Sequence, residues 1–578
     1  TLNNDSSAKV EVQILADENY NELIYKNVSN MVSEVALSPN GKEIAFIARG
    51  EVFVTSTDYR QTKRITNTPE QERSVSFSPD GKALLFAGER ENSWNLYQVK
   101  MGLPEEKYFY AATLLEEEII LANDQETFQA AYSPDGKEVG FLQERTEIRV
   151  INLESKAVRT VLPARYNYSY SDGDLSFSWS PDSKWILAEY LPYQRWNSDI
   201  ALISADGQQI TNLTESGYQC SRPKWVMDGE AVLWFSDRHG MRSHGSHGSQ
   251  SDAYAMFLTG EGYERFKLNK GEFALLKEIE KEAKKEQGED EDDEQEQETK
   301  TLSFDLAGAK DRVERLTIHS SALSDAVMTK AGDKLYYLSR FEKGYDLWVH
   351  DFKKQETKLL SKLGTGGAGL ALSKDEDDLF VLSNRSIKKV GTKDKSVKPV
   401  QYTAQMPFDR AGEYRYMFDH VWRQTAKKCY VEDLHGVDWK FYGEAYRPFL
   451  DHINNGFDYS EMLSELLGEL NASHTGARYY GKPENRDATG TLGIYPDYSH
   501  PGPGVKIKAI LDKSELLIKG EKAKVGETIV AINGEEILHL SHYYELMNQK
   551  AGEKLLLSIA SENGNRRNEY VKAVSVGA

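Results

Sequence analysis

The sequence predicts a mainly β, multidomain protein in which a seven-bladed β-propeller is followed by a small helical module and a compact third domain. Three observations carry this prediction. A Ser-Pro-Asp-Gly turn recurs along the first two thirds of the chain, and helical periodicity replaces alternating strands near Tyr402. The 578 residues also exceed what one hydrophobic core usually organises.

The repeats occupy residues 30–400. Clear turns stand at Ser38-Pro39, Ser78-Pro79, Ser133-Pro134 and Ser180-Pro181, and degenerate copies at Met227–Gly229, Lys330–Lys334 and Ser373–Asp375. A second apolar strand should follow each turn (Glu43–Ile47, Ala83–Phe86), and often a third (Glu51–Val54, Asn95–Val99, Ile148–Ile151, Asp346–Val349). Pro and Gly at fixed turn positions favour propeller blades over the alternative, tandem β-sandwich hairpins.

An insertion, Gly271–Lys300, is expected to separate the fifth blade from the sixth. It opens with apolar residues at helical spacing and ends in the acidic tract Glu289–Glu298. Such a like-charge block repels itself, so we interpret it as a solvated loop, with cation binding as the alternative.

Two glycine-rich stretches are candidate sites. His239, His244 and His247 could hold a transition metal, but a Gly/Ser loop does not preorganise the ligands, so an interblade loop is favoured. Gly364–Gly369 lacks the Lys-Ser/Thr of a phosphate loop. We therefore expect neither a metal nor a cofactor.

The composition limits the partners. A formal net charge of -20 argues against nucleic acid or an anionic membrane as the main partner, and no apolar run is long enough for a membrane span. Cys220 and Cys429 lie far apart and are expected to be free thiols. The chain opens on polar residues without Met, so we expect a leader or upstream domain to have been removed; the compartment stays open between periplasm, slightly favoured, and cytoplasm.

Three helices are predicted in the module at 401–488: Tyr414–Lys427, Lys440–Ile453 and Ser460–Leu470. Asp458 and Glu461 form a capping-box-like start of the third helix, and Asn471 and Gly476 are stop signals. Ser473 and His474 should therefore lie in the turn beyond this helix. Histidine is the usual general base near neutral pH, although a lone Ser-His pair is more often an ordinary surface feature.

The third domain covers residues 489–578. Thr491-Leu492-Gly493-Ile494 is an apolar glycine loop, and Asn533-Gly534 predicts a tight hairpin within Val525–Ile537. A helix at Ser541–Lys550 and a strand at Lys554–Ala560 should follow.

Several motifs resemble one family. Trp422-Arg423, Leu434–Trp439, Tyr446–Pro448 and Leu466–His474 resemble the core region of tricorn protease and its bacterial homologues, serine peptidases related to the C-terminal processing peptidases. The repeated turns resemble those of TolB-like and tricorn-type propellers, and the third domain resembles PDZ domains. The resemblance implies that His474 is the general base and that Ser473 links it to a distant glutamate. It also implies that Leu492, Gly493 and Ile494 form a peptide-binding loop.

The resemblance implies an order of parts: a lead-in at 1–29, the propeller, the helical module and a PDZ domain. In the family, the nucleophilic serine lies in a domain after the PDZ, and no Gly-x-Ser-x-Gly motif occurs between Gly490 and Ala578. We therefore expect a fragment of a peptidase of oligopeptides, inactive alone and completed by a catalytic domain in cis or in trans, with homo-oligomers possible. The alternatives are a non-catalytic propeller–PDZ scaffold for peptides and, more weakly, a TolB-like envelope-assembly protein.

Overall fold

The computed structural model of the chain describes residues 23–168, 175–193, 196–242, 249–286, 301–367, 369–481 and 488–575. The chain falls into two compact units, Thr1–Gly476 and Ala477–Ala578, and each is described by itself.

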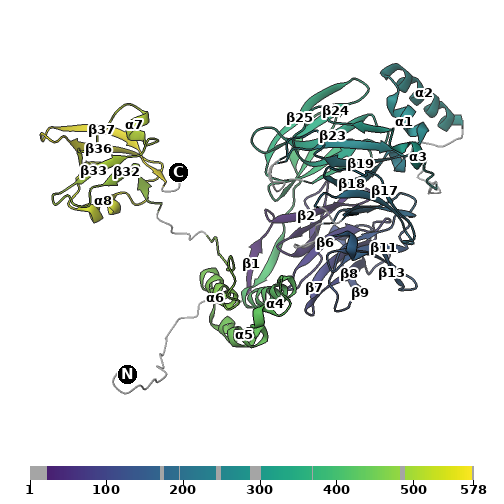
Figure 1. Cartoon of the computed structure of the whole chain (residues 1–578), viewed down its shortest axis with the longest axis horizontal. Coiled ribbons are helices and arrows are strands. Elements are labelled where there is room, and N and C mark those ends of the chain that lie inside the picture. Colours follow the sequence, from purple (N-terminus) through teal and green to yellow (C-terminus); the bar gives the residue numbers. More distant parts are fainter. Residues whose placement is uncertain are drawn as a thin grey trace. The chain divides into compact units, whose positions relative to one another are not determined.

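Seven four-stranded antiparallel sheets fill most of the first unit within the described residues, and each keeps its strands in chain order (Figure 1). Blades 1 to 3 are β2–β5 (Val32–Leu37, Glu43–Ala48, Glu51–Ser56, Thr62–Arg64), β6–β9 (Glu72–Phe77, Ala83–Arg90, Ser93–Met101, Leu115–Leu121) and β10–β13 (Thr127–Tyr132, Glu138–Gln143, Glu147–Asn152, Val158–Leu162). Blades 4 and 5 are β14–β17 (Phe177–Trp179, Trp185–Tyr190, Asp199–Ser204, Ile210–Asn212) and β18–β21 (Cys220–Val226, Ala231–Ser236, Asp252–Phe257, Val313–Arg315). Blades 6 and 7 are β22–β25 (Ala322–Met328, Lys334–Arg340, Tyr345–Asp351, Glu356–Thr365) and β26–β29 (Leu370–Leu372, Asp378–Ser383, Ser386–Gly391, Val397–Pro399). The predicted seven-bladed propeller is confirmed.

The second and third strands of each blade are the most buried, because neighbouring blades pack on both of their faces. All six residues of β3 and of β4 are buried. One apolar cluster, with Trp94, Phe141 and Ile186 among its members, runs through blades 2, 3 and 4. Because these strands are continuous apolar runs, the second strand of each repeat could be predicted from the sequence.

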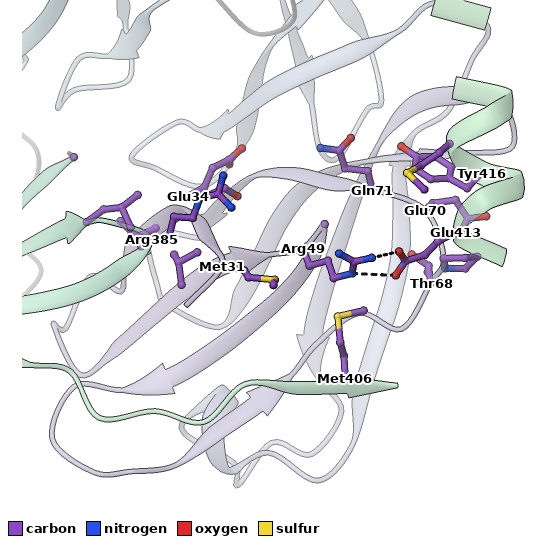
Figure 2. Close-up of a pocket in the computed structure, with 18 of the residues that line it drawn as sticks. Met31, Glu34, Arg49, Thr68, Glu70, Gln71, Arg385, Met406, Glu413 and Tyr416 are labelled. Carbon is purple, nitrogen blue, oxygen red and sulfur yellow. Dashed lines mark hydrogen bonds and ion pairs between the residues drawn. The ribbon is translucent and has the colours of Figure 1, made fainter. Parts of the chain in front are cut away.

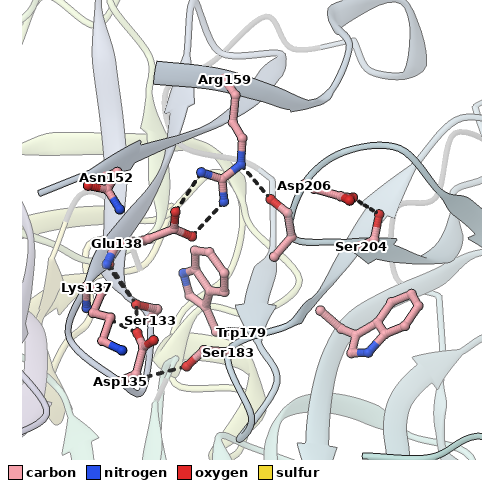
Figure 3. Close-up of polar contacts among 12 residues, drawn as sticks. Ser133, Asp135, Lys137, Glu138, Asn152, Arg159, Trp179, Ser183, Ser204 and Asp206 are labelled. Carbon is pink, nitrogen blue, oxygen red and sulfur yellow. Dashed lines mark hydrogen bonds and ion pairs between the residues drawn. The ribbon is translucent and has the colours of Figure 1, made fainter. Parts of the chain in front are cut away.

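The recurring turn is a structural device, and blade 3 shows how it works (Figure 3). The Ser133 hydroxyl donates to Asp135 Oδ1 (2.6 Å), the Lys137 amide donates to the same oxygen (3.1 Å), and the Glu138 amide donates to Ser133 Oγ (3.0 Å). Gly136 takes a φ of 70°, where a glycine is favoured. The Asp135 amide donates to Ser183 Oγ of the next blade's turn (3.0 Å). The motif therefore closes the turn within a blade and joins it to the turn of the neighbouring blade.

The insertion lies inside blade 5, and the predicted place between blades 5 and 6 was wrong. Helices α1 (Gly260–Lys267), α2 (Lys270–Glu286) and α3 (Leu306–Ala309) stand between β20 and β21. The fourth strand of this blade, β21, has three residues, too few for a periodic signal. The acidic tract Glu289–Glu298 lies outside the described residues.

The ends of the propeller are joined by a strand pair that was not predicted. Strand β1 (Leu23–Asn27) comes from the lead-in and pairs antiparallel with β30 (Gln405–Asp409), which follows blade 7. Each blade consists of consecutive strands, so blades 1 and 7 exchange none. The β1–β30 pair and the buried residues Val28, Val400, Ala404 and Met406 close this seam.

Three α-helices follow: α4 (Arg410–Lys428), α5 (Trp439–Tyr446) and α6 (Gly456–Gly468). The second predicted helix is shorter, because Pro448 starts a 3-10 segment at Arg447–His452. The third begins earlier than predicted: the Asn455 side chain accepts from the amides of Phe457 and Asp458, so Asn455 and not Asp458 is the cap.

The second unit is a small sheet with two helices. Its main sheet has the order β32-β33-β34-β36-β37, with β35 on β34, and β31 pairs with β38. The strands are β31 Gly490–Thr491, β32 Ile494–Pro496, β33 Val505–Ile510, β34 Thr528–Ile532, β35 Glu535–Glu536, β36 Lys554–Ala560, β37 Arg566–Lys572 and β38 Val574–Ser575; the helices are α7 Glu515–Ile518 and α8 Leu540–Leu546. Its apolar core, from Leu492 to Ala573, is separate from those of the propeller.

Candidate functional site

Ser473 and His474 follow helix α6 and lie at the surface of the first unit. The buried face of α6 carries Tyr459, Met462, Leu463 and Leu466. The Tyr459 ring stacks on Tyr414 of α4 at 4.3 Å, and its hydroxyl donates to the Tyr414 carbonyl (3.1 Å). Helix α6 is thereby fixed to α4, and the turn after it starts from a fixed point.

Ser473 and His474 both lie in this turn and are exposed. His474 takes a φ of 63°, and Asn471 before it a φ of 49°, both in the left-handed region. Left-handed backbone is uncommon for residues with a Cβ and turns the chain sharply. Within the described residues, neither side chain has a hydrogen-bond partner, so the structure brings the pair together without a nucleophile or an acid beside it.

The segment between α4 and α6 is held by two tryptophans. Trp422 Nε1 donates to the Trp439 carbonyl and Trp439 Nε1 donates to the Trp422 carbonyl, both at 2.9 Å. Gly443 lies against Trp422 so closely that a Cβ would be 2.5 Å from the indole nitrogen. The Tyr446 hydroxyl donates to Glu469 (2.8 Å), just before the Ser473–His474 turn. Trp422, Trp439 and Tyr446, three residues of the motifs quoted above, therefore hold the helical module together.

Helix α4 lies across the hairpins of blades 1, 2 and 3. Glu413 pairs with Arg49 of blade 1, and Gln424 donates to Glu126 of blade 3 (2.5 Å) while accepting from Arg145 (2.6 Å). Lys427 pairs with Glu126 and Glu144 (3.2 and 3.0 Å). A row of polar contacts, one group per blade, thus fixes the helix to the propeller.

Glu89 of blade 2 is the centre of this contact. Its buried carboxylate receives Tyr416 Oη and His420 Nδ1, both at 2.6 Å, and the Arg423 guanidinium at 3.0 Å. Burial alone would raise the pKa of Glu89, but these three partners outweigh it and hold the pKa below its usual value. Burial, and then the charge of Glu89, raises the pKa of Tyr416. The site is therefore a charged carboxylate with neutral and cationic donors around it.

A cavity of about 1170 Å³ opens beside the first turn of α4 (Figure 2). Blade 1, blade 7 and α4 form its walls, and the Arg49–Glu413 ion pair spans it. Three methionines, Met31, Met406 and Met417, are among the apolar residues that line it. This cavity could not be predicted from the sequence, because its walls come from segments far apart in the chain.

The predicted peptide-binding loop lies in the second unit. Leu492 is 3% exposed and belongs to the core, Gly493 has a φ of 66°, and Ile494 begins β32. The Gly493 amide donates to Thr491 Oγ1 (3.1 Å), and the Leu492 carbonyl accepts from Ser514 Oγ (2.6 Å). A Cβ at Gly493 would lie 3.1 Å from the Ser514 side chain, so the loop needs glycine here for space as well as for φ.

Metal ligation gains no support among the described residues, where no group of three or more His, Cys, Asp or Glu could hold an ion. His239 pairs with the Tyr254 hydroxyl through Nδ1 (2.5 Å), and His244 and His247 lie outside the described residues. Cys220 is buried and Cys429 half-buried, and both are free, as predicted. In the described ranges, no helix has the length and apolarity that crossing a membrane requires.

Comparison with known proteins identifies the helical module. The tricorn protease C1 domain matches residues 410–468, from the start of α4 to the end of α6. A tricorn protease homolog of Saccharolobus solfataricus is 22% identical over 601 residues, which cover 99% of this chain and 51% of that protein. A putative tricorn-like protease C-terminal subunit of Sulfurisphaera tokodaii is 23% identical over 430 residues, 70% of this chain and 47% of that protein. The chain thus spans about half the length of the curated relatives it matches.

A crystal structure of tricorn protease has the same fold. It aligns with a TM-score of 0.73 at 15% identity over 97% of this chain and 54% of that one. At 15% identity the alignment establishes the architecture alone. The chemistry has to be argued from the residues of this chain.

Proposed function

We propose that this chain, which carries a tricorn C1 domain and shares the fold of tricorn protease, supplies part of the active site of a serine peptidase that cleaves oligopeptides. The observation that supports this most directly is the position of His474. It stands exposed in the turn that ends the C1 helices, on a scaffold fixed by α6, the tryptophan pair and α4. An imidazole in that place can approach a serine that another domain brings to it.

In this proposal His474 takes the proton from the nucleophile, and Ser473 orients the imidazole. A general base needs such a partner, because one ring nitrogen must stay a proton acceptor while the other is held. The nucleophile, the oxyanion donors and the glutamate partner would come from a catalytic domain outside this sequence, in cis or in trans. The relative named as a C-terminal subunit supports considering the second arrangement.

The propeller would admit or filter peptide, and the second unit would position it. The second unit has the features of a PDZ domain: a glycine loop at Leu492–Ile494, an Asn533-Gly534 hairpin with φ of 51° and 87°, and a helix, α8, before the strand β36. Such domains add an extended peptide to a sheet edge.

The test is the turnover of the complete natural gene product after His474→Ala. Loss of a triad histidine lowers kcat by about 10⁶-fold in subtilisin, so peptide hydrolysis should fall to background. His452→Ala, in the exposed 3-10 segment of the same module, is the matched control and should keep full activity. Hydrolysis that survives His474→Ala would refute the assignment.

A peptide-binding scaffold without catalysis is the second candidate. It is favoured by one observation, that Ser473 and His474 have no hydrogen-bond partner within the described residues. Peptide binding without hydrolysis by the complete gene product would establish it.

A further inference from the structure

An arginine of blade 7 lines the cavity beside α4. Its side chain has no partner among the described residues. Four blades turn from their second to their third strand through a tight hairpin with two left-handed residues: Arg49-Gly50, Glu91-Asn92, Glu144-Arg145 and Asn384-Arg385. In blades 1 to 3 these hairpins hold α4, through Arg49 to Glu413, Asn92 to Arg423, and Glu144 to Lys427. The hairpin of blade 7 does not.

Arg385 is the residue that differs. Its φ is 61°, and Gly50, Asn92 and Arg145 occupy the corresponding place in blades 1, 2 and 3. The guanidinium of Arg145 is paired with Glu126 (2.7 Å). The Arg385 carbonyl accepts from the Val32 amide (3.2 Å), which fixes the hairpin against blade 1. Its exposed guanidinium makes no hydrogen bond or ion pair within the described ranges. The guanidinium of Arg385 is therefore available to a ligand in the cavity.

On the opposite side of the cavity lies a carboxylate that has no hydrogen-bond or ion-pair partner among the described residues. Figure 2 shows Arg385 beside Glu34 on one side, and Glu70 and Glu413 near α4 on the other. Glu413 is paired with Arg49, and Glu34 accepts from the Ser74 amide (2.6 Å). Glu70, which is half-buried, has no recorded partner among the residues that the structure describes.

The surface between these two charges combines the Arg49–Glu413 ion pair with methionine side chains. Met31 lies between Arg385 and Glu70 in Figure 2, with Met406 below, and Met417 also lines the cavity. The side chain of Met31 is 39% exposed. Methionine side chains have three rotatable bonds and fit varied apolar groups.

We propose that this cavity binds a short linear peptide with both termini free, its C-terminal carboxylate on Arg385, its N-terminal ammonium on Glu70 and its side chains on the methionines. A guanidinium matches a carboxylate in a bidentate geometry, and the carboxylate of Glu70 complements an ammonium. The volume of about 1170 Å³ is ample for such a ligand. The proposal deepens the proposed function, on which it rests for the class of ligand.

Titration calorimetry of the whole chain with Ala-Phe-Ala tests it, using the free tripeptide, its C-terminal amide and its N-acetyl form. Each blocked end removes one charge-assisted contact, so each should weaken binding about 10-fold or more. Arg385→Gly should abolish the preference for the free carboxylate without loss of thermal stability, since glycine suits this φ. Glu70→Gln should abolish the preference for the free amine.

Lys395→Gly is the matched control. Lys395 lies in the same blade, is exposed and has a φ of 59°, so the substitution removes one charge under the same backbone conditions. It should leave binding unchanged. Equal binding of the free and amidated peptide, or undiminished binding after Arg385→Gly, would overturn the proposal.

The experiment is independent of catalysis. His474→Ala should leave this binding intact, so a failed peptidase assignment and a failed cavity assignment give different results.

Discussion

Glu72 is fully buried where blade 1 meets blade 2, next to a second buried carboxylate, Glu51. Burial raises the pKa of Glu72 to about 8, Glu51 adds to the rise, and the ion pair with Arg90 (2.9 Å) offsets part of it. Because the folded state holds this proton more tightly than the unfolded chain, where the pKa is 4.5, its contribution to stability is complete below pH 4.5. It is lost as the pH rises towards 8.

Glu72→Gln should therefore flatten the pH dependence of stability. Relative to the variant, the wild type should lose up to about 1.4 kcal/mol per pH unit between these two pKa values. Urea unfolding followed by tryptophan fluorescence from pH 4 to pH 9 measures the difference. Glu118→Gln, an exposed carboxylate paired with Lys100, is the control and should run parallel to the wild type. A parallel curve for Glu72→Gln would contradict this account of the buried pair.

At the residue scale, the sequence predicted where the candidate residues lie better than it predicted what they do. The apolar spacing of Met462, Leu463 and Leu466 was sufficient to place Ser473 and His474 after a helix, because helix periodicity is local. Their catalytic roles stay predictions. Glu89 and Arg385 were missed, since their partners and surroundings come from other blades and from α4, which no local pattern records.

Helix α4 is the element that links the C1 domain to the propeller, and its contacts are mostly charged. Arg423 reaches both Glu89 and Asn92 (3.0 and 2.8 Å), and its side chain is 17% exposed. Removing it leaves the buried Glu89 carboxylate with two of its three partners.

Arg423→Ala should loosen α4 by roughly 3 kcal/mol, because a buried charge loses its ion pair. Hydrogen exchange of the α4 amides should accelerate by about 100-fold. Arg415→Ala on the same helix breaks only the exposed ion pair with Asp451 and should change exchange less than about 3-fold. Equal effects of the two variants would show that packing and not Glu89 holds the helix.

The errors at the element scale have physical causes. A helix start was assigned to Asp458 because a capping-box pattern fits it, whereas the Asn455 side chain makes the cap. Three strands were not predicted: β21, which has three residues, and β1 and β30, which have five each. They are short and pair with partners far away in the chain.

Among the described strands, blades 1 and 7 exchange none, so we expect the closure of the propeller to depend on the β1–β30 pair. Phe408 of β30 is 5% exposed and lies under Lys26, whose Nζ is 3.4 Å from the ring centroid, and near Arg49. This ring covers the seam from which the cavity opens.

Phe408→Ala should destabilise the first unit by about 3 to 5 kcal/mol, the usual cost of a buried Phe. Phe341→Ala, on the hairpin of blade 6 and 49% exposed, should cost about 0.5 kcal/mol. Thermal unfolding compares them. A small effect of Phe408→Ala would show that the ring closes without the strand pair.

The whole-molecule prediction succeeded where the sequence repeats and failed where it does not. Four clear copies and three degenerate copies of one turn sufficed for the propeller. The Ser and Asp side chains repeat the same hydrogen bond even in the seventh copy, where Glu376 stands in place of glycine. The closure of the ring and the place of the insertion needed contacts between distant segments.

The central claim is that His474 serves a serine outside this sequence. The most direct measurement is mass spectrometry of the natural gene product, isolated complete from its own cells and treated with a serine-reactive phosphonate. We expect a single labelled serine outside residues 1–578, and we expect His474→Ala to abolish the labelling. A label on a serine within this chain, or labelling that persists after His474→Ala, would contradict the account.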